Sequence, residues 1–500
     1  MKSRTHDLTA PMAAPPAVDL NREALGSLAG GSAARAATTD DASDISVGLE
    51  LKFLLLRPSA GWSASTRDKS GLRAQDGAAA DPAALQRLAY ALVAQTINHT
   101  GSQQAVTIHD IEKAGRQERE YWPTHWIVKK ANSVQPLTPE DLRLPAGSLV
   151  PVELSSPRLR WYDLASAPPS GRTDRDRPGS PIHVVLAALK RTLQVRVNYT
   201  CDVHVHIGRM DGKSMSLPTL KRLATLLWLA EPTLRAIRDP RSPNYANVYT
   251  WGSELRRYSR LATAASWSPP GAEREEELRQ LRTGSLSAAG NTEAAELASC
   301  LPSAVGDAVR TIWRAASYPE LGWLLSGPVP QFRRLGFNFS AFGGEDERAR
   351  TGPRTVEFRV LEGTLRDALV AGWVHICCEL VELAGGGSES YVSTDRAAAR
   401  PRFGEVVRRL GEAERSLVPV VTSAPAGAQQ GSGQSKQPQQ PVPPALEPDD
   451  AAAAFGELLG WAGVDAAISA PFQAKIRRDR GLGAAAKVAA GEAGSGGGSD

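Results

Sequence analysis

Four short segments of the chain would each place ionisable side chains on one side of a β-strand. The segments are GLELKF (48–53), PVELSS (151–156), CDVHVHIG (201–208) and TVEFRVL (355–361). Alternate residues of a strand face the same side, so each segment has one apolar side. The opposite sides carry Glu50 and Lys52, Glu153 and Ser155, Asp202 with His204 and His206, and Glu357 and Arg359. A solvated strand face usually carries Thr, Ser, Lys and Gln, so this choice of carboxylates and imidazoles indicates a site.

These polar sides predict a site for a divalent metal ion and phosphate if the strands lie together. Three carboxylates at short range repel one another unless cations intervene. The available cations are a divalent metal, Lys52 and Arg359. Carboxylate oxygens, water and phosphate are the usual ligands of Mg²⁺, and a guanidinium suits a phosphoryl group in transfer.

The elements that must position these residues predict an α+β domain at 45–385. Strands are expected at 45–56, 151–157, 201–208, 332–342 and 354–365. Helices are expected from 82, from 181, from 218 past 231, and over 367–384. Apolar residues at helical spacing, such as Leu220, Leu223 and Leu227, mark these helices, and a proline stands at the first position of several.

The ends of the chain and one internal stretch differ in composition from the expected domain. Residues 1–44 are rich in Ala, Pro and Ser and predict a disordered leader. Residues 262–300 are charged and Ala-rich, which indicates an insertion. Residues 386–500 predict a low-complexity, disordered tail, Pro- and Gln-rich at 421–448, with one short helix at 451–466.

Charge, cysteine content and hydropathy argue against several classes of protein. A net charge of +4 from 58 basic and 54 acidic residues gives no reason to expect nucleic acid. Four cysteines without a CxxC pair predict neither a disulfide framework nor a zinc knuckle, and Cys377 and Cys378 are expected to be packed thiols. The sequence contains no run of about 18 apolar residues, so it predicts no membrane span. Residues 1–30 lack the pattern of a secretory signal. We therefore expect a cytoplasmic protein in a reducing compartment.

Taken in chain order, the segments resemble the amidoligase family. The order is GLELKF, VELSSP, CDVHVHIG, LKRLATLLWLAEPTL, FNFSAF and TVEFRVLEGTLRD. Members typically show Gly-x-Glu-x-Glu, Glu-x-x-Ser-Pro, Cys-Gly-x-His-Val-His and Thr-x-Glu-Phe-Arg strands. The family is grouped with glutamine synthetase in the carboxylate–amine ligase superfamily. The resemblance covers most of 45–385 and implies a glutamine synthetase-like curved antiparallel sheet with helices packed outside.

The resemblance implies an ATP-dependent ligase that needs Mg²⁺ or Mn²⁺. ATP would phosphorylate a carboxylate of a small molecule or peptide, and an amine would attack the acyl phosphate to give an amide. The barrier is mainly electrostatic, so metals and cationic side chains supply most of the stabilisation. The resemblance implies no particular oligomeric state.

The motifs also imply a role for individual residues. The implied metal ligands are Glu50, Glu153, His206 and Glu357. The implied catalytic and nucleotide-binding residues are Arg359 on phosphate, His204 on metal or phosphate, and Lys52 as a point charge on phosphate. The implied substrate-binding residues are Arg241, Asn244 and Asn338.

The chain departs from the family pattern at two positions. Lys52 stands where the family has a second acid, and Ala131 stands where the Trp-x-x-x-x-Asp-x-Ser segment, here Trp126 to Ser133, has its acid. Two interpretations follow. Lys52 replaces the charge of a metal ion, or the site is degenerate and the domain binds nucleotide or a protein partner without turnover.

Three further interpretations compete with the metal site. His204 and His206 could be two hydrogen-bonded histidines of an ordinary sheet, and Glu357 with Arg359 an exposed strand pair. A His-x-His pair also occurs in TIM-barrel amidohydrolases, but the further metal histidine would have to be His375, on an expected helix. Finally, the tail helix with Phe455 and Trp461 could bind partners, with the preceding domain as a scaffold. The order of all the motifs favours the site.

Overall fold

A computed structural model describes eleven stretches of the chain. They are 45–56, 82–145, 147–165, 180–243, 245, 254–263, 288–327, 335–343, 352–385, 402–417 and 446–495. The expected leader (1–44) and Asn244 lie outside the described residues. So do 264–287 of the expected insertion and 386–401, 418–445 and 496–500 of the expected tail.

In the described residues, nine strands form one sheet in the order β2-β3-β4-β1-β7-β9-β8, and the short β5 and β6 also pair with β1. The strands are β1 (Ile45–Leu56), β2 (Gln104–Thr107), β3 (His125–Lys130), β4 (Leu149–Ser155), β5 (Leu159–Arg160), β6 (Val195–Arg196), β7 (Val203–Arg209), β8 (Phe337–Asn338) and β9 (Val356–Phe358). Three of the four segments with ionisable side chains therefore lie on the adjacent strands β4, β1 and β7, and the fourth lies on β9 beside β7.

The sheet is mixed, so the expectation of a wholly antiparallel sheet is wrong at one edge. The β2–β3 pair is parallel, whereas β1, β4, β7, β8 and β9 pair antiparallel. Two parallel neighbours need a crossover connection, and α2 with the 3₁₀ helix η2 supplies it between β2 and β3. The fold class, α with β, is as predicted.

Helices account for most of the remaining described chain. They are α1 (Pro82–Asn98), α2 (Ile108–Lys113), α3 (Pro139–Leu142), α4 (Trp161–Ala165), α5 (Pro181–Thr192), α6 (Leu217–Leu234), α7 (Leu255–Tyr258), α8 (Arg260–Thr263), α10 (Ala288–Ser299), α11 (Ser303–Arg314), α12 (Tyr318–Leu324), α13 (Ser340–Gly343), α15 (Asp367–Gly385), α17 (Phe403–Leu417), α18 (Pro448–Trp461) and α19 (Ala466–Ser495), with η2 (Glu118–Glu120) and η3 (Arg235–Ile237). The four helices expected from the sequence correspond to α1, α5, α6 and α15.

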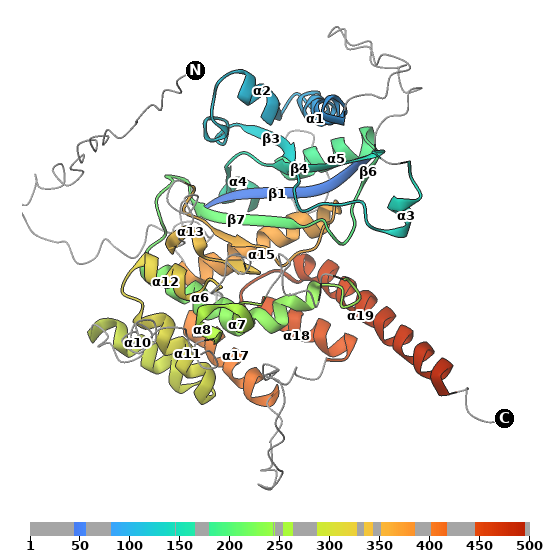
Figure 1. Cartoon of the computed structure of the whole chain (residues 1–500). Coiled ribbons are helices and arrows are strands. Elements are labelled where there is room, and N and C mark those ends of the chain that lie inside the picture. The colour runs from blue at the N-terminus through green and yellow to red at the C-terminus, as the bar shows by residue number, and fades with distance from the viewer. Residues whose placement is uncertain are drawn as a thin grey trace, which may run out of the picture. The chain divides into compact units, whose positions relative to one another are not determined.

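The apolar side of the sheet shares one core with the helices. Leu49, Leu51 and Phe53 of β1 are buried in the same cluster as side chains of α1, α5 and α15. Helix α5 contacts both α1 and α15, and α15 in turn contacts α6. Figure 1 shows β1, β3, β4 and β7 in the upper half of the view and α10, α11, α17 and α18 in the lower half, with α15 between them. The apolar side chains that recur along the strands and along the helices therefore meet in this one core.

The expected strands at 332–342 and 354–365 are short in the residues that the structure describes, which exclude 332–334. Within 335–342 and 354–365, only Phe337–Asn338 and Val356–Phe358 are strands, and Ser340 begins the single helical turn α13. The side chain of Asn338 accepts a hydrogen bond from the Ser340 amide at 3.0 Å. Such local side-chain bonds compete with strand pairing, which explains why β8 ends at Asn338.

The prediction of a low-complexity tail after 385 is wrong for the residues that the structure describes there. Helices α17, α18 and α19 lie in this stretch, and Phe455, Leu459 and Phe472 are buried in the main core. Phe472 packs where Gly372 of α15 leaves room, because a Cβ at Gly372 would lie 2.9 Å from the Phe472 ring. The expected helix at 451–466 becomes α18, which ends at Trp461. The expected insertion likewise ends in a helix that packs on the protein, since Ala294 of α10 is buried.

One described helix, α15, is long and apolar enough to cross a membrane, but 78% of its apolar window is buried inside the protein. The thiols of Cys377 and Cys378 on this helix are free and buried, as predicted. The helix α15 is therefore a core element of this fold.

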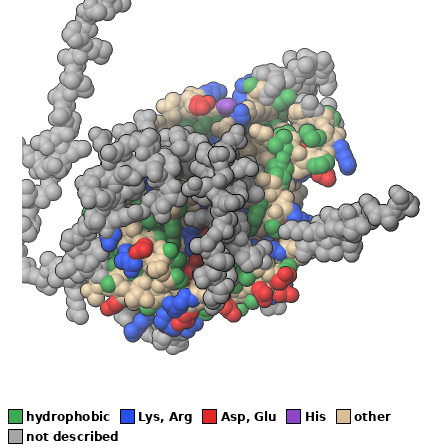
Figure 2. Space-filling view, turned by 60° about the horizontal axis from the view of Figure 1, so that its bottom comes forward, with side chains coloured by type: hydrophobic (Ala, Val, Ile, Leu, Met, Phe, Trp, Pro, Cys, Tyr) green, Lys and Arg blue, Asp and Glu red, His purple; other side chains and the backbone are tan. Residues whose placement is uncertain are grey.

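Acidic and basic side chains lie next to each other on the face shown in Figure 2, in line with the small net charge.

Candidate metal-binding site

The register of the sheet arranges the ionisable side chains in three rows across the strands, which we call the polar face. The first row is Asn338, Glu357 and His206. The second row is Arg359, His204, Glu50 and Ser155. The third row is Glu362, Asp202, Lys52, Glu153 and Lys129. The pairing of the strands therefore brings together residues from six strands, β3, β4, β1, β7, β9 and β8.

A group able to hold a metal ion lies in the first two rows. Glu50, His206 and Glu357 each offer one ligand atom, and these atoms lie within 4.8 Å of one another. Nε2 of His206 is 3.3 Å from Oε1 of Glu50 and 3.7 Å from Oε1 of Glu357. Two carboxylate oxygens and one imidazole nitrogen can together hold a divalent metal ion. Three of the four implied metal ligands are thus gathered at one point.

Neighbouring polar groups fix the orientation of these ligands. Nδ1 of His206 lies 3.3 Å from Oγ1 of Thr355, which leaves Nε2 directed at the carboxylates. Gly208 makes this contact possible, because a Cβ there would lie 2.9 Å from Cγ2 of Thr355. Nδ2 of Asn338 donates to Oε2 of Glu357 at 2.7 Å. Such outer contacts set the tautomer and direction of metal ligands.

His204 lies between the two carboxylates of the group and is fully buried. Its Nδ1 is 3.0 Å from Oε2 of Glu50 and 3.2 Å from Oε1 of Glu357. Arg359 and Lys52 approach the same nitrogen, each at 3.4 Å. An imidazole in this place can orient both carboxylates, and its burial places it behind the ligand atoms.

The neighbouring charges of the group stabilise the ionised forms of its members. Burial raises the pKa of Glu357, but Arg359 and the two histidines outweigh it and hold the pKa well below its usual range. Burial also raises the pKa of Glu50, but hydrogen bonds from His204 and His206 hold it well below its usual range. Burial lowers the pKa of His206, whereas Glu357 and Glu50 raise it, and the net shift is upward. Both carboxylates are therefore ionised near neutral pH.

Glu153 lies apart from the metal group and contacts two lysines. Its Oε2 is 3.8 Å from Nζ of Lys52, and its Oε1 is 3.5 Å from Nζ of Lys129. Lys129 also pairs with Glu118 at 2.7 Å. Burial and the nearby Glu50 raise the pKa of Glu153. The structure therefore places Glu153 as the partner of two cations, one of which, Lys129, the sequence analysis did not single out.

Arg359 lies inside the polar face with 1% of its surface exposed. Its guanidinium pairs with Glu357, and its backbone N–H donates to the Gly336 carbonyl at 2.7 Å. The guanidinium thus lies directly beside the metal group, where it can act on an anion bound there.

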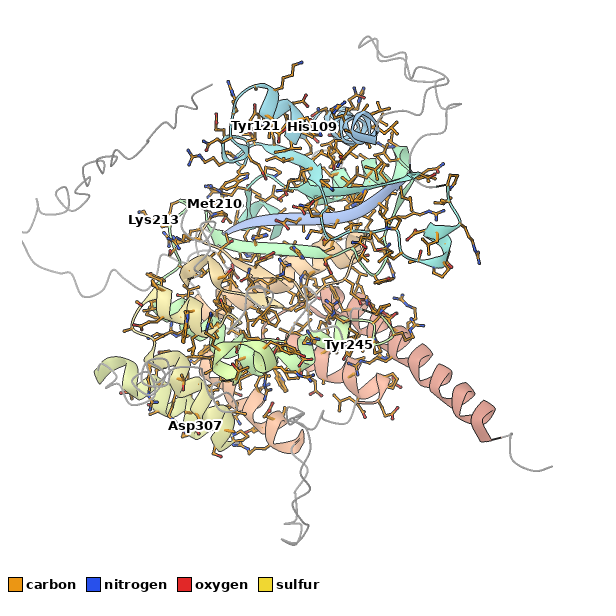
Figure 3. All side chains as sticks on the ribbon, in the orientation of Figure 1. His109, Tyr121, Met210, Lys213, Tyr245 and Asp307 are labelled. Atoms are coloured by element: carbon orange, nitrogen blue, oxygen red, sulfur yellow. The ribbon has the colours of Figure 1, made fainter. Side chains whose placement is uncertain are left out.

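The two described residues implied as substrate contacts lie in different places. Asn338 belongs to the site, as described above. Arg241 is half-exposed and pairs with Asp239 through two hydrogen bonds of 3.0 and 2.8 Å. Tyr245, labelled in Figure 3, follows in the same loop with its ring 6.0 Å from the Arg235 guanidinium. Arg241 interacts electrostatically with Asp479 of α19, so it lies near this C-terminal helix.

Two motif positions have structural roles. Ser156 accepts a hydrogen bond from the Leu49 amide at 2.9 Å and donates to the Pro157 carbonyl at 2.7 Å, which ties β4 to β1. Ala131 packs in a small apolar cluster with Leu54 and Cys201. This cluster closes one end of the polar face, so the position where the family has an acid is apolar here.

Thr355 and Lys129 are the site residues that sequence reasoning missed. Thr355 precedes Glu357 by two positions in TVEFR, so its place on the same side of the strand was a usable signal. Lys129 gave no signal of this kind, because its contact with Glu153 depends on the pairing of β3 with β4. No protein-family model and no curated protein matches this chain.

Proposed function

We propose that this domain is an ATP-dependent carboxylate–amine ligase with a glutamine synthetase-like fold, related to the amidoligases. The observation that supports the proposal is the gathering of Glu50, His206 and Glu357 at one point, with Arg359 beside them. These residues come from three motifs that are distant in sequence and adjacent in the sheet. The substrates are a carboxylate of a small molecule or peptide and an amine, and the nucleotide is ATP.

Each residue of the site has a defined task in this proposal. Glu50, His206 and Glu357 hold one Mg²⁺ or Mn²⁺, which supplies positive charge where the phosphoryl group is transferred. Arg359 binds phosphate oxygens and stays fixed by its contact with Glu357. Asn338 keeps Glu357 oriented toward the ion. Preorganised charges of this kind account for most of the stabilisation in phosphoryl transfer.

A nucleotide-binding module without turnover is the second candidate function. Lys52 and Lys129 already pair with Glu153, and Arg359 pairs with Glu357, within the polar face. A face that is balanced in this way attracts fewer metal ions than one with unpaired carboxylates. This balance favours a single bound ion, and a single ion can hold nucleotide without completing the reaction.

The apolar side chains of the tail helix α18, which suggested partner binding, pack within this chain. Phe455, Leu458 and Leu459 of α18 face the core of this chain and are at most 1% exposed. Trp461 packs against the same core. These side chains are therefore occupied by contacts within the protein.

Calorimetric titration with Mn²⁺ and ATP tests the proposal, using wild type, Glu357→Gln and Glu112→Gln. Glu357→Gln removes a ligand and is expected to weaken Mn²⁺ binding at least about tenfold. Glu112→Gln removes an exposed acid of α2 that lies outside the polar face and is the matched control. Phosphate release that requires both a carboxylate and an amine distinguishes the ligase from the nucleotide-binding module. Wild type that binds neither Mn²⁺ nor ATP would exclude both.

A further inference from the structure

A second buried cluster of charged residues joins helix α19 to the polar face. Lys475 of α19 is 8% exposed. Its Nζ donates to the Ile237 carbonyl at 2.6 Å, to Oδ2 of Asp479 at 2.7 Å and to Oε2 of Glu362 at 3.1 Å. Three acceptors saturate the three N–H groups of a lysine ammonium. Lys475 is therefore held in one place by contacts to η3, to its own helix and to the chain after Arg359.

Glu362 is the member of this cluster that lies in the third row of the polar face. It forms an antiparallel bridge with Asp202. On either side of the bridge, the Val203 amide donates to the Leu361 carbonyl at 3.1 Å, and the Gly363 amide donates to the Cys201 carbonyl at 2.8 Å. The approach is close, because a Cβ at Gly363 would lie 2.3 Å from Cβ of Cys201. The position of Glu362 thus fixes the start of β7.

The bridge places two acids directly opposite each other. Like charges in this position destabilise a strand pair. Asp202 is 2% exposed, so water screens the repulsion poorly. The compensating cations include Lys475, on Glu362, and Arg238, which interacts electrostatically with both acids and donates to the Val360 carbonyl at 3.2 Å. Arg241 also interacts electrostatically with Glu362. Removal of Lys475 takes away the cation in direct contact with Glu362, whose side chain is only 16% exposed.

Asp202 connects this bridge to the metal group. Its Oδ2 lies 3.9 Å from Nε2 of His204. The opposite ring nitrogen of His204 contacts Glu50 and Glu357, two of the metal ligands. A shift of the first residues of β7 therefore moves the imidazole that orients both carboxylates.

We infer that Lys475 of α19 is a positioning residue for the metal site, acting through Glu362 on Asp202 and His204. Its neutralisation of Glu362 allows the Asp202–Glu362 bridge to form, and the bridge sets His204. The C-terminal helix then belongs to the site although it supplies no ligand. The inference rests on the proposed metal binding, but its structural step can be measured without metal.

The experiment compares four forms of the full chain: wild type, Lys475→Met, Lys475→Met with Glu362→Gln, and Arg477→Met. Arg477 lies on the same helix and pairs with the exposed Asp449 at 3.0 Å, which makes it the matched control. Mn²⁺ affinity is measured by calorimetry. Hydrogen exchange of residues 200–207 and 359–365 is measured by mass spectrometry in the metal-free protein.

Lys475→Met is expected to weaken Mn²⁺ binding about tenfold or more and to speed exchange in both segments. Arg477→Met is expected to stay within about twofold of wild type, since exposed pairs contribute little. The double variant should recover most of the affinity, because it removes the repulsion together with its counter-charge. A single variant that fails to fold while the double variant folds supports the inference in the same way.

Three results would overturn the inference. The first is unchanged exchange in Lys475→Met, whether or not the protein binds metal. The second is faster exchange with unaltered Mn²⁺ affinity, and the third is a double variant no better than the single one. If wild type binds no Mn²⁺, the proposed function fails, and the exchange rates then decide on the role of Lys475 alone.

Discussion

At the scale of single residues, His206 shows how the site is prepared for a ligand. One ring nitrogen faces a hydroxyl, that of Thr355, and the other faces two carboxylates. If the hydroxyl oxygen accepts a hydrogen bond from Nδ1–H, Nε2 is left as the nitrogen that can bind a cation. A neutral hydroxyl does this without adding a charge to a face that is already balanced.

Substituting Thr355 tests this arrangement. Thr355→Val keeps the shape of the side chain and removes the oxygen, so Mn²⁺ affinity should fall about 10- to 100-fold. Thr355→Ser keeps the oxygen and should bind nearly as wild type does. Calorimetry gives the affinity, and the ¹⁵N shifts of His206 report the tautomer. Equal affinity in the Val and Ser variants would contradict the role of the hydroxyl.

Strand alternation was sufficient to predict which residues of a segment share a side. It grouped Glu50 with Lys52, and His204 with His206, because both facts are local. It could not predict that Glu153 would meet Lys129, since that contact depends on how β3 and β4 align. Nor could it separate Glu153 from the metal group, because Glu50, Glu153 and Glu357 are acids of the same type in three similar segments.

At the scale of elements, Glu231 links two helices by an unusual end contact. It lies in α6 with 1% exposure, and its carboxylate accepts the Leu255 and Arg256 amides at 2.6 and 2.7 Å, where α7 begins. Burial raises the pKa of Glu231 from 4.5 to about 7, although Arg235 and the two amides lower it. Glu254 contributes a smaller upward effect.

This shift makes stability depend on pH in a defined window. The folded state binds a proton on Glu231 more tightly than the unfolded state, so the favourable contribution is complete below pH 4.5 and is lost as pH rises through about 7. The loss is on the order of 3 kcal/mol. Glu231→Gln should flatten this part of the stability curve, measured by urea unfolding from pH 5 to 8. The exposed Glu112→Gln is the control, and an unaltered slope in Glu231→Gln would refute the assignment.

Long elements were predictable from the sequence and short ones were not. Helices α5, α6 and α15 carry an apolar residue every three or four positions, which local sequence displays directly. The strand β8 has two residues and owes its end to the side chain of Asn338. The parallel pairing of β2 with β3 depends on the path of the intervening α2, which residue patterns do not specify.

At the scale of the whole molecule, the C-terminal helices complete the core. The ring of Phe472 lies 5.9 Å from that of Phe455 and 6.3 Å from that of Trp373. The sequence did not predict this, because α19 is rich in Ala and Gly and lacks a broad apolar stripe. The room for Phe472 is made by Gly372, which lies far away in the chain. The composition of a segment does not reveal which distant segment it packs against.

Truncating this ring measures what the C-terminal helices contribute. Phe472 is fully buried, so Phe472→Ala should lower the free energy of unfolding by about 3–5 kcal/mol. Leu446→Ala, at a half-exposed position, should cost much less. Urea denaturation of both variants checks the difference. Equal losses would mean that α19 packs only loosely on α15.

The dependence of α15 on α19 has a consequence for synthesis of the chain. The apolar helix around Gly372 leaves the ribosome about a hundred residues before Phe472, which covers it. At about 5–20 residues per second this interval is roughly 5–20 s. During that time a segment with the composition of a membrane span is without its final cover. The nascent chain therefore offers chaperones and targeting factors a binding segment that the finished protein hides.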